Sequence, residues 1–224
     1  MTSPVALLHN TYYHIYNRGN NRENIFIEER NYQHFLNLYT RYIDPVAEIF
    51  AYCLLRNHFH LLVRVRSEEE IIKILKVSTA IQKPVKQGIL ASRENDSMEK
   101  PLGSASPSKK FSDFFNAYAK SINKAYGRTG SLFQHPFGGV PVTTDRQFWN
   151  VIAYIHQNPQ KHKFVEDFRD WKWSSYGILL ADAPTKLNRE AVLDWFGGKE
   201  GYLELHERWV SDADRKWFAE DDVD

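Results

Sequence analysis

Two histidines of this 224-residue chain lie in a stretch whose residue types are not explained by packing alone. Residues 52–66 read YCLLRNHFHLLVRVR, and from His58 onward they follow the apolar pattern of a buried strand. Side chains two positions apart on a strand point the same way, so His58 and His60 face one side with backbones about 7 Å apart. Two imidazoles at this spacing can bind one metal ion if a third ligand comes from elsewhere. Two half-buried histidines bonded to polar neighbours would give the same pattern.

A tyrosine and an asparagine form a second candidate pair in the downstream sequence AYIHQNP, which ends at Pro159. A T-x-x-Q capping box that begins at Thr144, together with the proline, predicts a helix over residues 145–158. Tyr154 and Asn158 are one helical turn apart, so a phenol and an amide share one edge of this helix. The tyrosine could instead pack against a sheet, and the asparagine could be a helix cap.

Together these stretches resemble the REP-associated tyrosine transposases, a family within the single-tyrosine HUH transposases. His58-Phe59-His60 resembles the HUH signature, in which a bulky hydrophobic residue separates two histidines. Tyr154 with Asn158-Pro159 resembles the family's Tyr-x-x-x-Asn-Pro motif. Four longer stretches share the resemblance in the family's order: YYHIYNRG at 12–19, LLRNHFHLLV at 54–63, GRTGSLFQ at 127–134 and WKWSSY at 171–176. The remainder of the chain after these stretches has no such match.

The resemblance implies a metal-dependent endonuclease and strand transferase that acts on single-stranded DNA at hairpins of repeated palindromic elements. Tyr154 would attack the DNA and leave a 5′-phosphotyrosine and a free 3′-OH. His58, His60 and Asn158 would hold the metal ion. Two imidazoles exclude the usual all-oxygen calcium site, whereas the mixed nitrogen and oxygen set suits Mg²⁺ or Mn²⁺ without separating the two.

A polar turn after the first expected strand supplies candidate DNA contacts. Asn17 ends that strand, and Arg18 and Arg22 flank the turn that follows. The resemblance implies that this turn lies beside the active site and the DNA backbone. Lys161, in a small basic cluster beyond the tyrosine helix, is a further candidate for phosphate contact. Arginine-bearing turns are also common as solvated loop tips.

Two other functions stay open from the residues alone. A catalytically silent module that binds single-stranded nucleic acid would use the sheet and its aromatic residues. Trp171 and Trp173 would stack on unpaired bases if exposed, or anchor the C-terminal segment if buried. A metal hydrolase would use His58 and His60 with Cys53 or another histidine to activate water. Cys53 lies five residues before His58, so the strand pattern does not obviously bring it to the histidines.

Two further tyrosines are rival nucleophiles. Tyr118 and Tyr126 belong to an expected helix over residues 111–126. Tyr118 lies on the apolar stripe of that helix, which favours packing, and neither tyrosine is followed one turn later by a metal-binding residue type. Tyr154 therefore remains the preferred nucleophile.

The order of the expected elements predicts an α+β fold. Strands are expected over 11–17, 49–55, 58–66 and 138–142, and helices over 28–42, 68–87, 111–126 and 145–158. This order predicts a ferredoxin-like, four-stranded antiparallel sheet with helices packed on one face, and the resemblance implies the HUH endonuclease fold. Residues 88–110, poor in apolar side chains, are expected to form a flexible insertion. A further helical part is expected over residues 189–209.

Composition and charge are compatible with a globular protein that binds a polyanion. The chain is 42% hydrophobic and 25% charged. Residues 1–180, the expected HUH domain, hold 23 Lys and Arg against 16 Asp and Glu, whereas the acidic segment 181–224 holds 6 against 12. With no long apolar run, no export signal and a single cysteine, we expect a cytoplasmic protein that does not enter a membrane. Both a monomer and a homodimer fit the sequence.

Overall fold

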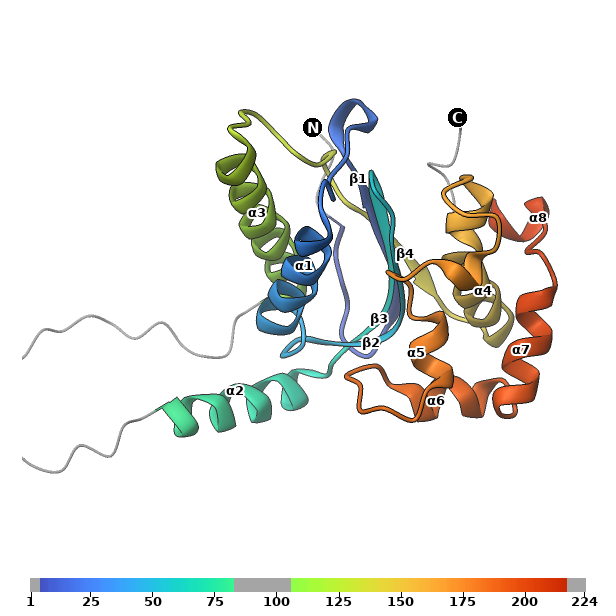
Figure 1. The fold of residues 1–224 in the computed structure, drawn as a ribbon. Helices are drawn as coiled ribbons and strands as arrows, with labels where there is room; N and C mark the ends of the chain where they lie inside the picture. The colour runs from blue at the N-terminus through green and yellow to red at the C-terminus, as the bar shows by residue number, and fades with distance from the viewer. Residues whose placement is uncertain (1–4, 83–105, 217–224) are drawn as a thin grey trace, which may run out of the picture.

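A four-stranded antiparallel sheet lies at the centre of the computed structural model, which describes residues 5–82 and 106–216 (Figure 1). Its strands are β1 (Tyr12–Arg18), β2 (Ala47–Leu54), β3 (His58–Val65) and β4 (Gly138–Val142). They pair in the order β2-β3-β1-β4, and every pairing is antiparallel. This is the strand order of a ferredoxin-like sheet, and it confirms the predicted α+β fold class.

Helices α1 (Glu29–Tyr42) and α3 (Pro107–Tyr126) cover one face of the sheet (Figure 1). Their aromatic side chains form the core on this side, where Phe35 lies 5.0 Å and Phe115 lies 5.4 Å from Phe59 of β3, measured between ring centroids. α3 begins four residues before the predicted start, because proline is well suited to the first helical position. Residues 107–110 are therefore helical and not part of a flexible insertion, while residues 88–105 lie outside the described part.

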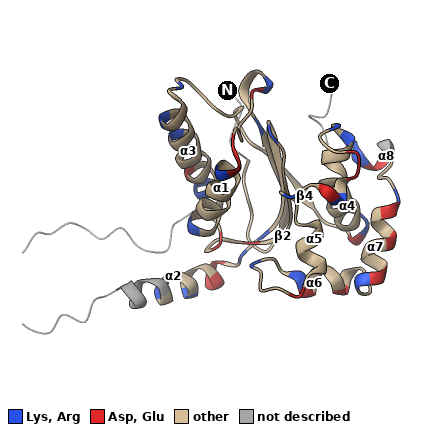
Figure 2. Ribbon diagram, viewed as in Figure 1, with Lys and Arg blue, Asp and Glu red and all other residues tan. Residues whose placement is uncertain are grey.

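The opposite face is covered by α4 (Asp145–Lys161) and by the C-terminal helices, so the expectation of helices on one face only is wrong (Figure 1). The physical reason is the sheet itself: β2 and β3 are buried along nearly their whole length, and such strands need cover on both faces. The C-terminal elements are η2 (Phe168–Asp170), α5 (Tyr176–Leu180), α6 (Arg189–Trp195), α7 (Lys199–Glu207) and α8 (Asp212–Arg215). Lys, Arg, Asp and Glu lie mainly on the outer helices and loops, and few lie on the sheet (Figure 2).

The C-terminal helices share the core of the sheet. Trp195 of α6 packs 3.6 Å from Phe148 of α4 and 5.4 Å from Phe50 of β2, measured between ring centroids. Val192 and Tyr202 are fully buried in the same apolar cluster as the strands. Residues 187–210 therefore help to hold α4 against the sheet.

The capping box predicted for α4 is present, since the Thr144 hydroxyl accepts a hydrogen bond from the backbone N–H of Gln147 at 3.2 Å. The predicted end of this helix is wrong, because α4 continues through Pro159 to Lys161. A proline has a helical φ and removes only one backbone hydrogen bond, and the next turn closes with a 3.0 Å bond from His162 N–H to the carbonyl of Asn158. The extra turn keeps His162 in helical register with Asn158.

Helix α2 (Glu68–Gln82) extends away from the body of the molecule (Figure 1). Its predicted continuation over 83–87 lies outside the described residues. No helix within residues 5–82 and 106–216 is long and apolar enough to cross a membrane.

Candidate active site

Three histidines meet on the face of the sheet that α4 covers. His58 and His60 of β3 are both buried, and their ring centroids lie 5.2 Å apart with the planes nearly perpendicular. His14 of β1 joins them, with its Nε2 atom 3.0 Å from His60 Nδ1 and its ring stacked on that of His60 at 5.1 Å. The pairing of β1 with β3 produces this contact, so no local motif marks His14.

A hydrogen bond to Asn57 orients the His58 ring. Its Nδ1 atom lies 2.7 Å from the side-chain oxygen of Asn57. An amide oxygen only accepts hydrogen bonds, so Nδ1 is the donor, and in the neutral ring Nε2 carries the lone pair. Metal-binding histidines in proteins are held in the same way by an acceptor on their second nitrogen.

Tyr154 of α4 lies against this cluster and is only 2% exposed. Its ring stands edge-on to His60 at 5.4 Å and to His14 at 5.9 Å, measured between centroids. The ammonium of Lys161 lies 5.4 Å from the centroid of the same ring, so a positive charge accompanies the phenol. The structure thus brings the tyrosine, both motif histidines and Lys161 to one place.

Asn158 is fully buried one turn beyond Tyr154, and its Nδ2 atom donates to the Tyr154 carbonyl at 3.1 Å. Its Oδ1 atom is buried and accepts no hydrogen bond from any residue that the structure describes. At the next turn, the His162 ring lies 4.9 Å from that of His58. Residues four apart share one side of a helix, so Asn158, between Tyr154 and His162, faces the histidines of β3.

His162 is a site residue that the motifs do not mark. It follows Asn158 by one turn, a spacing that would have identified it if the helix had not been expected to end at Pro159. Together with His14, it brings the number of histidines around the site to four.

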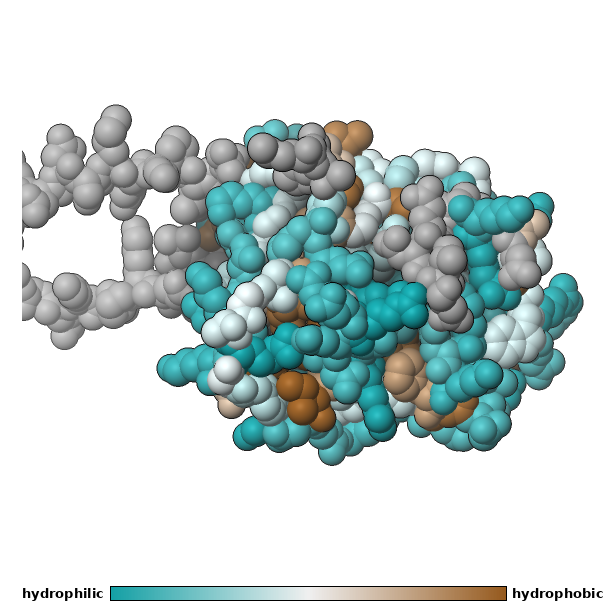
Figure 3. Space-filling view, turned by 90° about the horizontal axis from the view of Figure 1, so that it is seen from above, coloured by the Kyte–Doolittle hydropathy of each residue, from teal (hydrophilic) through white to brown (hydrophobic). Residues whose placement is uncertain are grey.

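The side of the molecule where β1 and α4 end is mostly hydrophilic, with scattered small apolar patches (Figure 3). Lys and Arg lie on the loop after β1 and near the ends of α3 and α4 (Figure 2). A polar, partly basic surface around the site is better suited to binding a charged polymer than to binding an apolar ligand.

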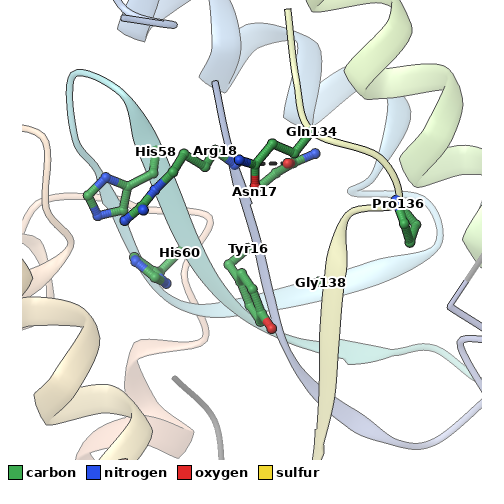
Figure 4. Close-up of a pocket in the computed structure, with 8 residues that line it drawn as sticks. All are labelled: Tyr16, Asn17, Arg18, His58, His60, Gln134, Pro136 and Gly138. Atoms are coloured by element: carbon green, nitrogen blue, oxygen red, sulfur yellow. Dashed lines mark hydrogen bonds between the residues drawn. The ribbon is translucent and has the colours of Figure 1, made fainter. Parts of the chain in front are cut away.

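A small cavity opens beside the two motif histidines. Its volume is about 30 Å³, room for roughly one water-sized group. Arg18 points toward His58 (Figure 4), and the Asn17 side-chain oxygen accepts a hydrogen bond from the Arg18 N–H at 2.8 Å. Asn17 and Arg18 both line the cavity, together with six further residues: Tyr16, His58, His60, Gln134, Pro136 and Gly138. Arg22 is exposed in the short helix η1 (Asn20–Arg22) and is not among them.

The ligand types at the site limit how a metal ion could be held. No three His, Cys, Asp or Glu side chains within residues 5–82 and 106–216 are arranged to hold a metal ion. Cys53 lies directly opposite His60 in the pairing of β2 with β3, closer than its sequence offset indicates. Burial raises the pKa of its thiol well above 9, so the thiol stays protonated at neutral pH. A metal ion here would therefore need the amide oxygen of Asn158.

The rival tyrosines are engaged elsewhere. The Tyr118 hydroxyl donates to the carbonyl of Ile25 at 2.8 Å, and burial raises the pKa of this phenol well above 10. The Tyr126 hydroxyl donates to Glu28 at 2.9 Å. Both lie on α3, on the opposite side of the sheet from the histidines (Figure 1).

The two tryptophans of the WKW sequence serve as anchors. Trp173 stacks on Tyr32 with centroids 4.7 Å apart and planes 10° apart, and the ammonium of Lys172 lies 5.2 Å from the Trp173 centroid. Trp171 donates its indole N–H to the carbonyl of Leu54 at 2.9 Å. These contacts fasten the segment after α4 to the sheet and to α1.

No protein-family model and no curated protein matches this chain. Among solved structures, the chain is similar to a REP-associated tyrosine transposase bound to a REP hairpin, with a TM-score of 0.52. The match covers 82% of this chain and 88% of the other at 13% sequence identity. At this identity the likeness shows a shared fold.

Proposed function

We propose that this protein is a metal-dependent endonuclease and strand transferase for single-stranded DNA, with Tyr154 as its nucleophile. The observation that carries the proposal is the position of Tyr154, whose ring contacts His60 and His14 and lies one turn from the buried oxygen of Asn158. The similar solved structure is bound to a REP hairpin, which supports hairpins of repeated palindromic elements as the substrate class.

His58, His60 and Asn158 would hold Mg²⁺ or Mn²⁺. The fit rests on the Asn158 oxygen, which is buried and lacks a hydrogen bond from the described residues, and on the orientation of His58 by Asn57. When bound, such an ion polarises the scissile phosphate and offsets its developing negative charge. The ligand set is neutral, so the ion would keep its full charge for the phosphate.

The chain's own residues would carry out the transfer. The Tyr154 oxygen attacks the phosphorus, the bond from phosphorus to the 3′-oxygen breaks, and a phosphotyrosine forms on the 5′ side. The phenolic proton is lost and the departing 3′-oxygen gains one, so the products are a tyrosine ester and a 3′-OH. The Lys161 ammonium beside the ring and the Arg18 guanidinium beside His58 would offset negative charge during this exchange. Attack by another 3′-OH on the ester joins the strands without an external energy source.

The burial of Tyr154 favours a second candidate function, a module that binds single-stranded DNA without cutting it. A side chain that is only 2% exposed must gain access to the phosphate before it can react. A silent module would bind DNA with strong salt dependence and would form no covalent product.

A covalent adduct separates the two functions. We expect a labelled hairpin oligonucleotide with single-stranded flanks to comigrate with the wild-type protein on a denaturing gel when Mn²⁺ is present, and not in excess EDTA. Tyr154→Phe should remove the adduct and retain DNA binding, because only the attacking oxygen is lost. Tyr118→Phe, a buried tyrosine on the other face of the sheet, is the matched control and should keep the adduct. Adduct formation by Tyr154→Phe would exclude Tyr154 as the nucleophile.

A further inference from the structure

We propose that Tyr16 is the platform on which the nucleobase next to the cleaved phosphate stacks. This inference rests on the proposed function, since it takes the mouth of the small cavity beside His58 and His60 as the place where DNA binds. Tyr16 is half-buried, lines that cavity (Figure 4), and provides its only benzene ring among the eight lining residues.

Tyr16 belongs to a row of rings across the sheet. It follows His14 by two residues on β1, and the two ring centroids lie 5.1 Å apart with planes inclined by 34°. The His60 ring lies 6.1 Å away at a similar inclination of 32°. A planar ligand that stacks on Tyr16 would therefore lie beside His60, one of the two imidazoles that we propose to hold the metal ion.

Gly138 of β4 is what lets the Tyr16 ring lie flat over the sheet. The two residues are opposite each other in the pairing of β1 with β4. A Cβ atom at position 138 would lie 2.2 Å from Cζ of Tyr16 and within 2.6 Å of both Cε atoms, too close for any side chain. The glycine thus fixes one face of the ring against the backbone.

The remaining polar groups of the cavity suit a nucleotide. Arg18 brings a guanidinium for the phosphate, and the exposed Gln134 brings an amide that can bond to the edge of a base. Trp173, an aromatic candidate for base stacking in the sequence, is covered by Tyr32 and Lys172. An aromatic platform with one guanidinium and one amide fits an unpaired nucleotide of single-stranded DNA.

The test measures coupling between the ring and a base. Binding is measured in EDTA with Tyr154→Phe protein, which cannot cleave, using a hairpin oligonucleotide in which each flanking nucleotide in turn is abasic. We expect one abasic position to weaken binding by about 5- to 150-fold, the range for loss of one stacked base. Adding Tyr16→Ala should weaken binding to the intact oligonucleotide by a similar factor and abolish the effect of that abasic position.

Three further variants sharpen the result. Tyr16→Phe should bind like the parent, because the ring and not the hydroxyl carries the contact. Gly138→Ala should weaken binding as Tyr16→Ala does, because it displaces the ring without removing it, and it serves as the second test if Tyr16→Ala does not fold. Tyr42→Ala, a half-buried tyrosine on α1 away from the cavity, should leave the abasic profile unchanged.

The outcomes test the platform and the proposed function separately. Unchanged sensitivity to every abasic position in the Tyr16→Ala protein would mean that no base stacks on this ring. Equal losses in Tyr16→Phe and Tyr16→Ala would assign the effect to the hydroxyl. Coupling without any covalent adduct in the wild type would retain the platform and reject the endonuclease. An adduct without coupling would retain the endonuclease and reject the platform.

Discussion

Lowering the pH from 7 to 5 should destabilise the protein through His206 of α7. His206 Nδ1 lies 2.7 Å from the Tyr202 carbonyl, so this nitrogen must be the donor and Nε2 must be an acceptor. Nε2 then accepts from His156 Nδ1 at 2.8 Å, and His156 Nε2 accepts from the Ser175 hydroxyl at 2.7 Å. A proton added to His206 Nε2 would set this N–H against the N–H of His156 Nδ1, and both rings are buried.

The magnitude follows from the pKa of His206. Burial, with a smaller contribution from the charge of Arg169, lowers this pKa from 6.5 to about 4, although the bond to the Tyr202 carbonyl opposes the change. As the pH falls below 6.5, His206 becomes protonated in the unfolded chain but stays neutral in the folded protein. The contribution of His206 to folding stability is therefore fully present above pH 6.5 and is lost progressively toward pH 4. Linkage gives a loss of about 2 kcal/mol between pH 7 and pH 5 from this residue alone.

Urea unfolding followed by tryptophan fluorescence at pH 7, 6 and 5 measures this loss, and the His206→Gln variant is the control. The variant should lose about 1–3 kcal/mol at pH 7, because a buried hydrogen-bond partner is removed. Its stability should then fall by about 2 kcal/mol less than that of the wild type between pH 7 and 5. Parallel pH profiles for the two proteins would show that His206 is not held neutral by the fold.

Three further outcomes are expected. Thr144→Ala should cost about 1 kcal/mol in urea unfolding through loss of the α4 cap, whereas Thr144→Ser should cost little; equal costs would contradict the capping role. Asn57→Ala should raise the Mn²⁺ concentration needed for half-maximal adduct formation by about 10- to 100-fold, because His58 loses its orienting acceptor; an unchanged Mn²⁺ titration would refute this. Tyr118→Phe should cost about 1 kcal/mol, since its buried hydroxyl is bonded, whereas Tyr39→Phe should be neutral or stabilising, since the buried Tyr39 hydroxyl has no hydrogen-bond partner among the described residues; the reverse order would be inconsistent with these contacts.

Local sequence patterns were sufficient for the four strands, for the helices between them and for the two motifs, although not for every helix end. Alternation along β3 predicts that His58 and His60 point the same way, and the four-residue spacing of Tyr154 and Asn158 predicts a shared helix edge. The capping box locates the start of α4 because the hydrogen bonds of a helix end involve only neighbouring residues. The order of these elements was also enough to predict the four-stranded antiparallel sheet.

Only the tertiary structure decided which other residues join the site. His14, Tyr16 and Cys53 are close to His60 because three strands pair in one register, and register is a long-range property that no local spacing encodes. His162 joins the site because α4 continues past Pro159. At this point, packing against the sheet outweighs the loss of one backbone hydrogen bond. Helices also cover the second face of the sheet because β2 and β3 are buried on both faces, which is a property of the whole sheet and not of one segment. The sequence by itself thus determined what each segment would be, and the fold determined which side chains meet, because contacts between distant segments depend on all of them at once.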